Sequence, residues 1–386
     1  MKSERIYLDN AATTRLRPEA AAAVREAEAE YNPSSLHSEG RRARAALDAA
    51  RELVATSIGA KRNEIVFTAS GTESDNLALL GVARTGRPGA HVVTTAIEHH
   101  AVLGALARLG EESFETTVLP VDSGGRVDPE EFESALRPST VLASVMYANN
   151  EVGTIQPIAQ LAAIARRRGV WFHTDAVQAG NWLSLDVETL GVDLLTLSAH
   201  KFGGPRGVGL LYARSDVALS PILYGGGQEL GRRSGTQNLP GIAGMARALG
   251  LAQSERIANA RRAGELRDRL EAGIQAAVSD VRVNGAAPRL PNHLNVSFAG
   301  TDAAALLIAL DLAGIAVSAG SACTSGSLEA SHVLRAMGLD ERWRTGAIRF
   351  TLGVTTSASE IDRVVAALPS IVAGLRAPAT LLRGDG

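Results

Sequence analysis

Short apolar runs rich in β-branched residues alternate along the chain with alanine-rich stretches whose apolar positions recur at helical spacing. Seven of these runs predict strands, at residues 65–68, 91–95, 117–119, 141–147, 170–174, 194–198 and 208–212. Helical patterns lie between most of them, for example at residues 76–83 and 158–168. This alternation predicts an α/β fold with a mainly parallel sheet that helices cover on both faces.

A second, smaller α/β pattern follows the first. It comprises one long predicted helix over roughly residues 241–278, strands near 281–283 and 293–298, a helix that begins at Ala303, and a strand near 315–318. We therefore expect a large domain over residues 15–251 and a small domain over residues 252–386, with residues 1–14 packing on the small one. A length of 386 residues suits two domains, because one hydrophobic core stops growing at a smaller size.

The composition narrows the class of protein. Hydrophobic residues make up 45% and charged residues 21% of the chain, and the net charge of -2 argues against a nucleic-acid surface. The first ten residues contain no apolar signal core, and the most apolar stretch, residues 303–317, is interrupted by Asp311 and too short to span a bilayer. We expect a cytoplasmic protein that binds neither nucleic acid nor membrane. The single cysteine excludes an intrachain disulfide and argues against a thiolate zinc cluster, so no metal site is expected.

Candidate chemistry gathers where the predicted strands end, which is where parallel α/β sheets bind ligands. Lys201 follows the strand at residues 194–198 and precedes the pair Gly203-Gly204. A solvated surface lysine has a pKa of about 10.4 and is a poor nucleophile at neutral pH. A lysine at the mouth of a buried site can instead form a Schiff base with an aldehyde cofactor. The position between a strand and two glycines favours the second interpretation.

The segment after the strand at residues 65–68 has two interpretations. Gly71 lets the backbone approach a ligand closely, and helix N-terminal amides with the Thr72 hydroxyl could bind a phosphate. Ser70 and Glu73 also form an S-x-x-E capping box, which needs no ligand. The residues themselves leave both open.

Three further residues each allow a functional and a structural interpretation. Asp175 ends a predicted strand, where a carboxylate can hold a pyridinium nitrogen protonated or cap the next helix. His99 follows another strand, where its ring can stack on a flat cofactor and move protons or serve as a hydrogen-bonded loop residue. Arg349 lies in an alternating apolar stretch and either aims its planar fork at a carboxylate or faces water at a strand edge.

The surroundings of Cys323 set it apart from an ordinary buried cysteine. Within residues 318–327, every residue other than Cys323 is Gly, Ala, Ser or Thr, so the segment cannot build a core. We expect an exposed, mobile loop. A thiol is intrinsically very nucleophilic. A mobile thiol could take up a chemical group inside a pocket and deliver it outside that pocket.

Together these segments closely resemble the cysteine desulfurases of the NifS/IscS type, within the class V aminotransferase family. The resemblance covers nearly the whole chain in order, and its Cys323 loop is similar to that of the members that deliver sulfur to scaffold and carrier proteins. Tyr31, Ser70 and Ala330 depart from the family pattern, and none of them removes a reacting group. The matching segments are residues 8–14, 32–37, 71–76, 98–99, 148–153, 198–201, 233–238, 318–325 and 331–334.

The resemblance implies a pyridoxal 5'-phosphate enzyme of fold type I, with a seven-stranded, mainly parallel sheet in the large domain. It implies a homodimer with its active sites at the subunit interface. It also implies roles for named residues, which are expectations at this point. Lys201 would bind the cofactor covalently, Asp175 its pyridine nitrogen and Gln178 its ring hydroxyl, and His99 would stack on the ring. Gly71, Thr72, Ser198 and His200 would bind the phosphate, together with Thr236 of the other subunit, and Asn150 and Arg349 would hold the substrate carboxylate.

The implied reaction removes sulfur from L-cysteine, giving L-alanine and a persulfide on Cys323, with Lys201, Cys323 and His99 as the catalytic residues. An acceptor protein, either an iron–sulfur scaffold or a thiolation carrier, would then receive the sulfur. Two alternatives stay open. One is a pyridoxal-dependent transaminase or lyase, such as a selenocysteine lyase, in which Cys323 is not essential. The other is a non-catalytic scaffold for sulfur transfer.

Overall fold

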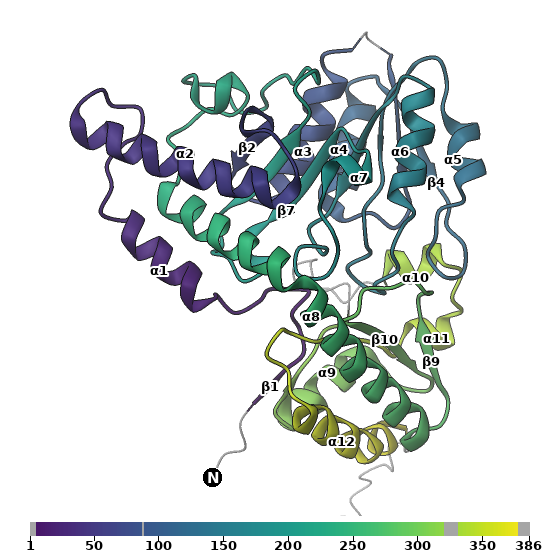
Figure 1. Ribbon diagram of the computed structural model, residues 1–386. Coiled ribbons are helices and arrows are strands. Elements are labelled where there is room, and N and C mark those ends of the chain that lie inside the picture. Colours follow the sequence, from purple (N-terminus) through teal and green to yellow (C-terminus); the bar gives the residue numbers. More distant parts are fainter. Residues whose placement is uncertain (1–4, 87–88, 320–330, 377–386) are drawn as a thin grey trace, which may run out of the picture.

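The computed structural model describes residues 5–86, 89–319 and 331–376. Figure 1 shows two bodies joined by one long helix, α8 (Leu239–Ala277), which runs from the larger body into the smaller. Cys323, and with it most of the loop predicted at residues 318–327, lies outside the described residues. Within the described residues, no helix combines the length and apolar character that crossing a membrane requires.

The larger body is built on a seven-stranded sheet in the order β2-β8-β7-β6-β5-β3-β4. All neighbouring strands run parallel except β8, which is antiparallel to both β2 and β7. The predicted α/β fold with a mainly parallel sheet is therefore confirmed. The strands are β2 (Ile65–Thr68), β3 (His91–Thr95), β4 (Glu115–Leu119), β5 (Thr140–Ser144), β6 (Trp171–Asp175), β7 (Leu194–Ser198) and β8 (Gly209–Ala213).

Helices cover both faces of this sheet because neighbouring residues of each strand point to opposite sides. Val92 packs with α3 (Gly71–Ala83) and α4 (His100–Glu111), whereas Val93 belongs to the core on the other face. That second face is covered by α2 (Ser38–Ile58), α5 (Pro129–Ala135), α6 (Ile158–Arg167), α7 (Val187–Leu190) and the first part of α8, with α1 (Pro18–Ala27) packed against α8. The short 3-10 helices are η1 (Arg62–Glu64), η2 (Ala199–Lys201) and η3 (Gln228–Gly231).

The smaller body contains a three-stranded antiparallel sheet in the order β12-β10-β9. Its strands are β9 (Val281–Asn284), β10 (His293–Phe298) and β12 (Ala347–Thr351). Its helices are α9 (Ala303–Leu312), α10 (His332–Ala336), α11 (Glu341–Arg344) and α12 (Ala358–Arg376). The first strand of the chain, β1 (Ile6–Tyr7), pairs in parallel with β11 (Ile315–Ala316), so the N-terminal segment joins the smaller body.

Helix α8 contributes to both cores. Ile242 and Met245, near its start, pack beneath the large sheet, whereas Leu270 and Ile274, near its end, pack in the core of the smaller body. The domain boundary that we predict between residues 251 and 252 falls inside this helix. The division into two domains remains a prediction.

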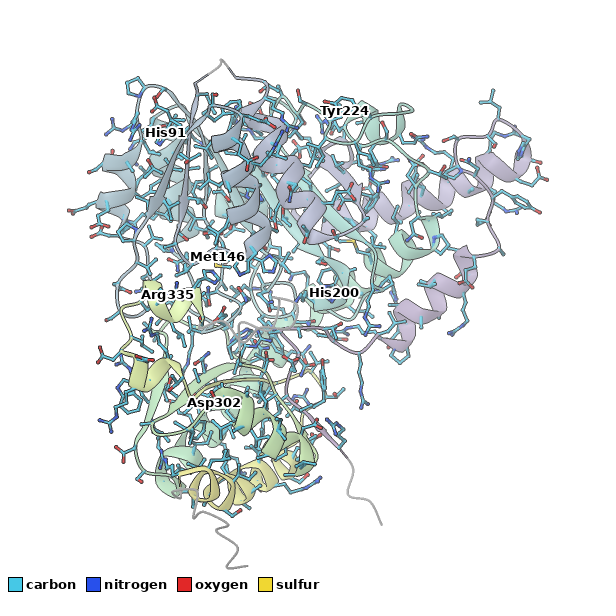
Figure 2. The ribbon with its side chains drawn as sticks, turned by 180° about the vertical axis from the view of Figure 1, so that it is seen from behind. His91, Met146, His200, Tyr224, Asp302 and Arg335 are labelled. Atoms are coloured by element: carbon cyan, nitrogen blue, oxygen red, sulfur yellow. The ribbon has the colours of Figure 1, made fainter. Side chains whose placement is uncertain are left out.

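Most element bounds agree with the sequence pattern, and the differences have a local cause. Helix α3 begins at Gly71, five residues before the predicted 76–83, because its polar first turn carries no apolar periodicity. Ser70 Oγ accepts a hydrogen bond from the Glu73 amide at 3.1 Å, which is the predicted cap. His200 and Met146 lie on the side of the large sheet that faces the smaller body (Figure 2).

Candidate active site

Lys201 ends the short helix η2, directly after strand β7, at the side of the sheet that faces the smaller body. Its Nζ donates to the backbone oxygens of Ala11, at 2.5 Å, and Ala12, at 3.0 Å. Gln178 donates from Nε2 to the same Ala11 oxygen at 3.0 Å. The N-terminal segment therefore brings the amine of Lys201 and the amide of Gln178 together.

Asp175 ends β6 beside Lys201, with only 6% of its surface exposed. Its Oδ1 accepts a hydrogen bond from the amide of Val177 at 2.9 Å. Burial raises the pKa of Asp175 to about 6, while the Val177 amide and the charge of Lys201 act to lower it. The side chain makes the local backbone contact that the structural interpretation expects, and it still offers a buried carboxylate that ionises below neutral pH.

His99 caps α4, and its Nδ1 accepts a hydrogen bond from the Ala101 amide at 3.1 Å. Burial first, and then the nearby charge of Lys201, lower the pKa of His99 to about 4. The ring is therefore neutral at pH 7, and its proton sits on Nε2 because Nδ1 is an acceptor. A neutral, half-buried imidazole near Lys201 is able to stack on a flat ring and to hand on one proton.

The start of α3 and the end of β7 meet closely. A Cβ placed on Gly71 would lie 3.0 Å from Val177 Cγ2 and 3.2 Å from Ser198 Cβ, so the backbone there leaves little room for a larger residue. His200 Nδ1 lies 3.1 Å from the Thr13 hydroxyl, and burial lowers the pKa of His200 to about 4. Thr72 is exposed beside Gly71. The helix N-terminus at this point is suited to an anion.

Arg349 is buried, with 4% of its surface exposed, although it lies on a strand. Its Nη1 donates to the backbone oxygen of Asn150 at 2.9 Å, and its Nη2 donates to the Asp9 carboxylate at 2.7 Å. Its Nε is buried without a hydrogen-bond partner among the described residues. The water-facing interpretation of Arg349 is thus wrong, because long-range contacts from two other segments enclose the guanidinium.

The described residues that flank the Cys323 segment, Ser318 and Ser331, both form hydrogen bonds near this arginine. Ser318 exchanges two backbone hydrogen bonds with Arg349, at 2.6 and 3.2 Å. On the far side of the undescribed residues, the Ser331 hydroxyl donates to the carboxylate of Glu151 at 2.5 Å. Glu151 follows Asn150, whose backbone oxygen binds Arg349. The chain therefore leaves and re-enters the described structure next to Arg349 and Asn150.

Thr236 lies in an exposed segment between η3 and α8. Arg233 of the same segment forms an ion pair with Glu73 of α3 at 2.8 Å. No hydrogen bond or ion pair of the described residues brings Thr236 to Lys201. Its predicted contact with the site of another subunit stays a prediction.

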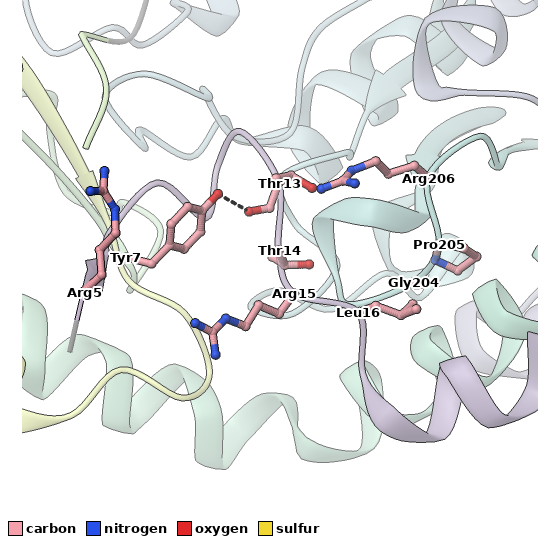
Figure 3. A pocket seen from close by; sticks show the side chains of 9 residues that line it. All are labelled: Arg5, Tyr7, Thr13, Thr14, Arg15, Leu16, Gly204, Pro205 and Arg206. Carbon is pink, nitrogen blue, oxygen red and sulfur yellow. Dashed lines mark hydrogen bonds between the residues drawn. The ribbon is translucent and has the colours of Figure 1, made fainter. Parts of the chain in front are cut away.

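A hollow of about 580 Å³ reaches Lys201 and Gln178 and is also lined by Asn10, Asn181 and Arg363. A neighbouring hollow of about 490 Å³ shares Tyr7, Thr14 and Arg15 of the N-terminal segment with the first one (Figure 3). Figure 3 shows the Arg206 side chain pointing toward Thr13, whose backbone oxygen accepts a hydrogen bond from the Tyr7 hydroxyl at 2.9 Å. Small molecules therefore have open space next to the Lys201 amine.

Three acidic residues of the site received no role from the sequence. Asp9 binds Arg349, Asp75 is buried in the first turns of α3, and Glu98 is buried just before His99. Burial raises the pKa of Glu98 to about 8. In the sequence, these residues are marked only by their position directly after an apolar run or at the start of a helix. Capping residues commonly occupy the same positions.

Comparisons with known proteins place this geometry in context. The family model "Aminotransferase class-V" matches residues 6–364. The "Cysteine desulfurase IscS" of Dictyoglomus turgidum is 47% identical over 380 residues, which cover 97% of this chain and 96% of the relative. A solved structure of a "NIFS-like protein" is 39% identical, with a TM-score of 0.90 over 96% of this chain and 100% of its own. The structure "SspA in complex with cysteine" is 34% identical, with a TM-score of 0.79 over 90% of this chain and 98% of its own.

Proposed function

The chain belongs to the class V aminotransferase family and is a cysteine desulfurase, and we propose that it uses Lys201 and pyridoxal 5'-phosphate to free the sulfur of L-cysteine and Cys323 to carry that sulfur away. The observation that carries this proposal is the anchoring of the Cys323 segment beside Arg349. The described residues on either side of Cys323 in the sequence, Ser318 and Ser331, thus lie near the arginine proposed to bind the substrate carboxylate.

The described residues fit pyridoxal phosphate. Gly71 lets the start of α3 pack closely against the end of β7, which brings a helix N-terminus suited to a phosphate to this point, and the neutral ring of His99 is suited to stack on a pyridine. Asp175 supplies a buried carboxylate for the ring nitrogen, and Lys201 supplies the amine. When bound, pyridoxal phosphate supplies an aldehyde that takes up the substrate amine and a ring that withdraws electrons from its Cα.

Lys201 has two tasks in this proposal. Its amine would hold the cofactor, and as a free amine it would take the proton from the substrate Cα. The oxygens of Ala11 and Ala12, which now accept hydrogen bonds from Nζ, keep the amine at the mouth of the site. His99, neutral and with a proton on Nε2, supplies or removes protons in the other steps.

Arg349 and Asn150 hold the substrate carboxylate. A guanidinium has five N–H donors. Asp9 and the Asn150 backbone oxygen use two of them, and the buried Nε has no partner among the described residues. The remaining donors are therefore held in place for a carboxylate before substrate binds, which avoids the entropy of ordering a long side chain.

Cys323 lies five residues beyond Ser318 in the sequence. An extended chain spans at most about 3.3–3.6 Å per residue, so the thiol can lie up to about 17 Å from Ser318. In the transfer step, the Cys323 thiolate bonds to the substrate sulfur while the substrate Cβ–S bond breaks. The three-carbon remainder is protonated at Cβ and regains a proton at Cα from the Lys201 amine, so that it leaves as L-alanine, and the outer sulfur stays on Cys323.

The persulfide on Cys323 then passes to a thiol of an acceptor protein. We propose an iron–sulfur scaffold or a thiolation carrier as the acceptor, in keeping with the IscS name of the relatives. We also propose a homodimer in which Thr236 of one subunit reaches the phosphate of the other. The exposure of Thr236 supports an intersubunit role.

Mass spectrometry of the intact protein after addition of L-cysteine tests the proposal. The chain has one cysteine, so any persulfide on it is on Cys323. We expect a gain of one sulfur atom that dithiothreitol removes, together with release of alanine. Cys323→Ser should keep the yellow absorbance of the cofactor and lose both products. Alanine release by Cys323→Ser at the parental rate would favour a lyase, and a colourless protein that cannot bind pyridoxal phosphate would favour a scaffold.

A further inference from the structure

Three carboxylic side chains are buried together next to the candidate active site. Asp75 is 1% exposed, Glu98 is 0% exposed and Asp175 is 6% exposed. Asp75 has no role in the chemistry described above. Its Oδ1 is buried and accepts no hydrogen bond from any described residue. A buried carboxylate oxygen without a partner is costly, so the protonation state of Asp75 needs an explanation.

Asp75 lies over the same face of the sheet as Asp175. His173 and Asp175 are two residues apart on β6, so their side chains share one face, and Thr196 of β7 is the register partner of Asp175. Phe172 and Leu195, which alternate with them, pack in the core of the opposite face. Helix α3 packs against β6 and β7 and places Asp75 over His173 and Thr196.

Hydrogen bonds link three side chains next to Asp75, those of Ser144, His173 and Thr196. His173 Nδ1 lies 2.8 Å from the Ser144 hydroxyl, and His173 Nε2 lies 3.0 Å from the Thr196 hydroxyl. The same Nε2 lies 3.7 Å from Asp75 Oδ1, which is too far for a hydrogen bond. Burial lowers the pKa of His173 to about 3, so this imidazole is neutral and supplies no positive charge to Asp75.

Asp175 and Asp75 differ in the neighbouring groups that raise or lower their pKa. Asp175 has the Val177 amide and the positive charge of Lys201, both of which favour its ionised form. Asp75 has a hydrogen bond from Thr196, which lowers its pKa, but burial first, then the negative charge of Asp175, and also Glu98, raise the pKa of Asp75 well above its ordinary value. Burial also raises the pKa of Glu98, which lies in the segment after β3, and so disfavours the ionised form of Glu98.

We propose that Asp75 is a positioning residue that stays a protonated carboxylic acid and thereby leaves Asp175 as the ionised member of the buried pair. This inference rests on the proposed function in one respect. In that function, the negative charge of Asp175 keeps a proton on the pyridine nitrogen. If Asp75 and Asp175 shared one negative charge, the carboxylate under that nitrogen would be ionised for only part of the time.

Infrared spectroscopy of the cofactor-free protein tests the charge of Asp75 directly. A protonated carboxylic acid has its own C=O stretch, and carbon-13 labelling of the aspartate carboxyls distinguishes Asp75 from Glu98. We expect a label-sensitive band at pH 7 in the parental protein that is lost in Asp75→Asn. It should be retained in Asp175→Asn and in the control Asp340→Asn, which changes an exposed aspartate.

Two results would overturn the proposal, and the first needs no variant. The label-sensitive band could be missing from the parental protein, which would mean that Asp75 is ionised, for example paired with a protonated His173. Alternatively, the band could survive in Asp75→Asn and disappear in Asp175→Asn, which would put the proton on Asp175.

Cofactor binding gives a second measurement. Asparagine cannot ionise, so Asp75→Asn should keep the dissociation constant for pyridoxal phosphate within about threefold, whereas Asp175→Asn should raise it by at least tenfold. An equal loss in both variants would overturn the role of Asp75 as a neutral acid. Unchanged binding by Asp175→Asn would instead contradict the proposed function, and it would leave the infrared assignment of the proton standing.

Discussion

The Arg349 guanidinium donates to the Asp9 carboxylate across 2.7 Å, although 340 positions separate the two residues in the sequence. The contact joins the segment after β1 to β12, and it leaves Arg349 with an ionic partner before any substrate is present. Hydrogen bonds to charged groups contribute about 1.5–3 kcal/mol each. Asp9 therefore decides how well Arg349 is oriented for a carboxylate.

Replacing Asp9 tests this orientation. We expect Asp9→Asn to raise KM for L-cysteine about tenfold and to change kcat by less than about threefold, because the lost contact acts on binding more than on chemistry. Steady-state alanine release measures both constants. Asp311→Asn is the matched control, since Asp311 pairs with the exposed Arg5 of the same N-terminal region. A KM that stays at the parental value in Asp9→Asn would show that Arg349 is held by its other contacts.

Lys201→Ala should remove the covalent attachment of the cofactor. Borohydride reduction of the parental protein should fix pyridoxal phosphate on the peptide that contains Lys201, and peptide mass spectrometry should find no such adduct in the variant. Lys61→Ala is the control, because Lys61 is an exposed lysine elsewhere in the chain. A reduced adduct of equal yield in Lys201→Ala would assign the attachment to another amine.

Gly71→Ala should weaken cofactor binding. The new methyl group would lie 3.0 Å from Val177 Cγ2 and 3.2 Å from Ser198 Cβ, so the start of α3 must move away from β7. We expect the dissociation constant for pyridoxal phosphate to rise about tenfold, measured by the change in visible absorbance on titration. Gly104→Ala in α4 places its methyl group in open space and should stabilise the protein by about 0.5–1 kcal/mol without weakening binding. Tight binding by Gly71→Ala would contradict a phosphate site at this turn.

Glu98→Gln should change how stability depends on pH. Burial raises the pKa of Glu98 to about 8 from an ordinary value of 4.5, so between these values the folded state binds a proton that the unfolded state lacks. This residue's contribution to the free energy of unfolding therefore falls as pH rises from 4.5 to 8, by about 1.4 kcal/mol per pH unit. Glutamine cannot ionise and should remove that slope.

Denaturant unfolding of the cofactor-free protein at pH 5.5 and 7.5 measures the effect. The difference in stability between Glu98→Gln and the parental protein should grow in favour of the variant at the higher pH. Glu26→Gln, which changes an exposed glutamate, should give the same difference at both values. Parallel pH dependences for Glu98→Gln and the parental protein would mean that Glu98 is ionised in the fold.

The fold could be predicted closely because its signals are local. The bounds of β2, β3, β7 and β10 agree with the apolar runs, and α6 differs by one residue at its end. Strand alternation and helical spacing act over a few residues and are visible in one sequence. The two-residue pairing of β1 with β11 carries no such signal, because its register depends on a distant segment.

The site was predictable in its residue types but less so in its contacts. Asp175 ends a strand, and Lys201 and His99 each follow one, so the order of strands alone brings them to one edge of the sheet. Burial of Arg349 could not be foreseen, because its enclosure depends on Asp9 and on the Asn150 backbone. Asp75 was equally hidden, since only the packing of α3 on β6 and β7 shows that it is buried next to Asp175.

The pairing of β1 with β11 also bears on biosynthesis. The large sheet ends at Ala213, so it has all its strands long before the ribosome reaches Arg349. Domains generally fold as units while the chain is being made. Strand β1 must wait for β11, which is made more than 300 residues later, and a nascent chain interrupted before Arg349 would carry Lys201 without the arginine proposed to bind the substrate carboxylate.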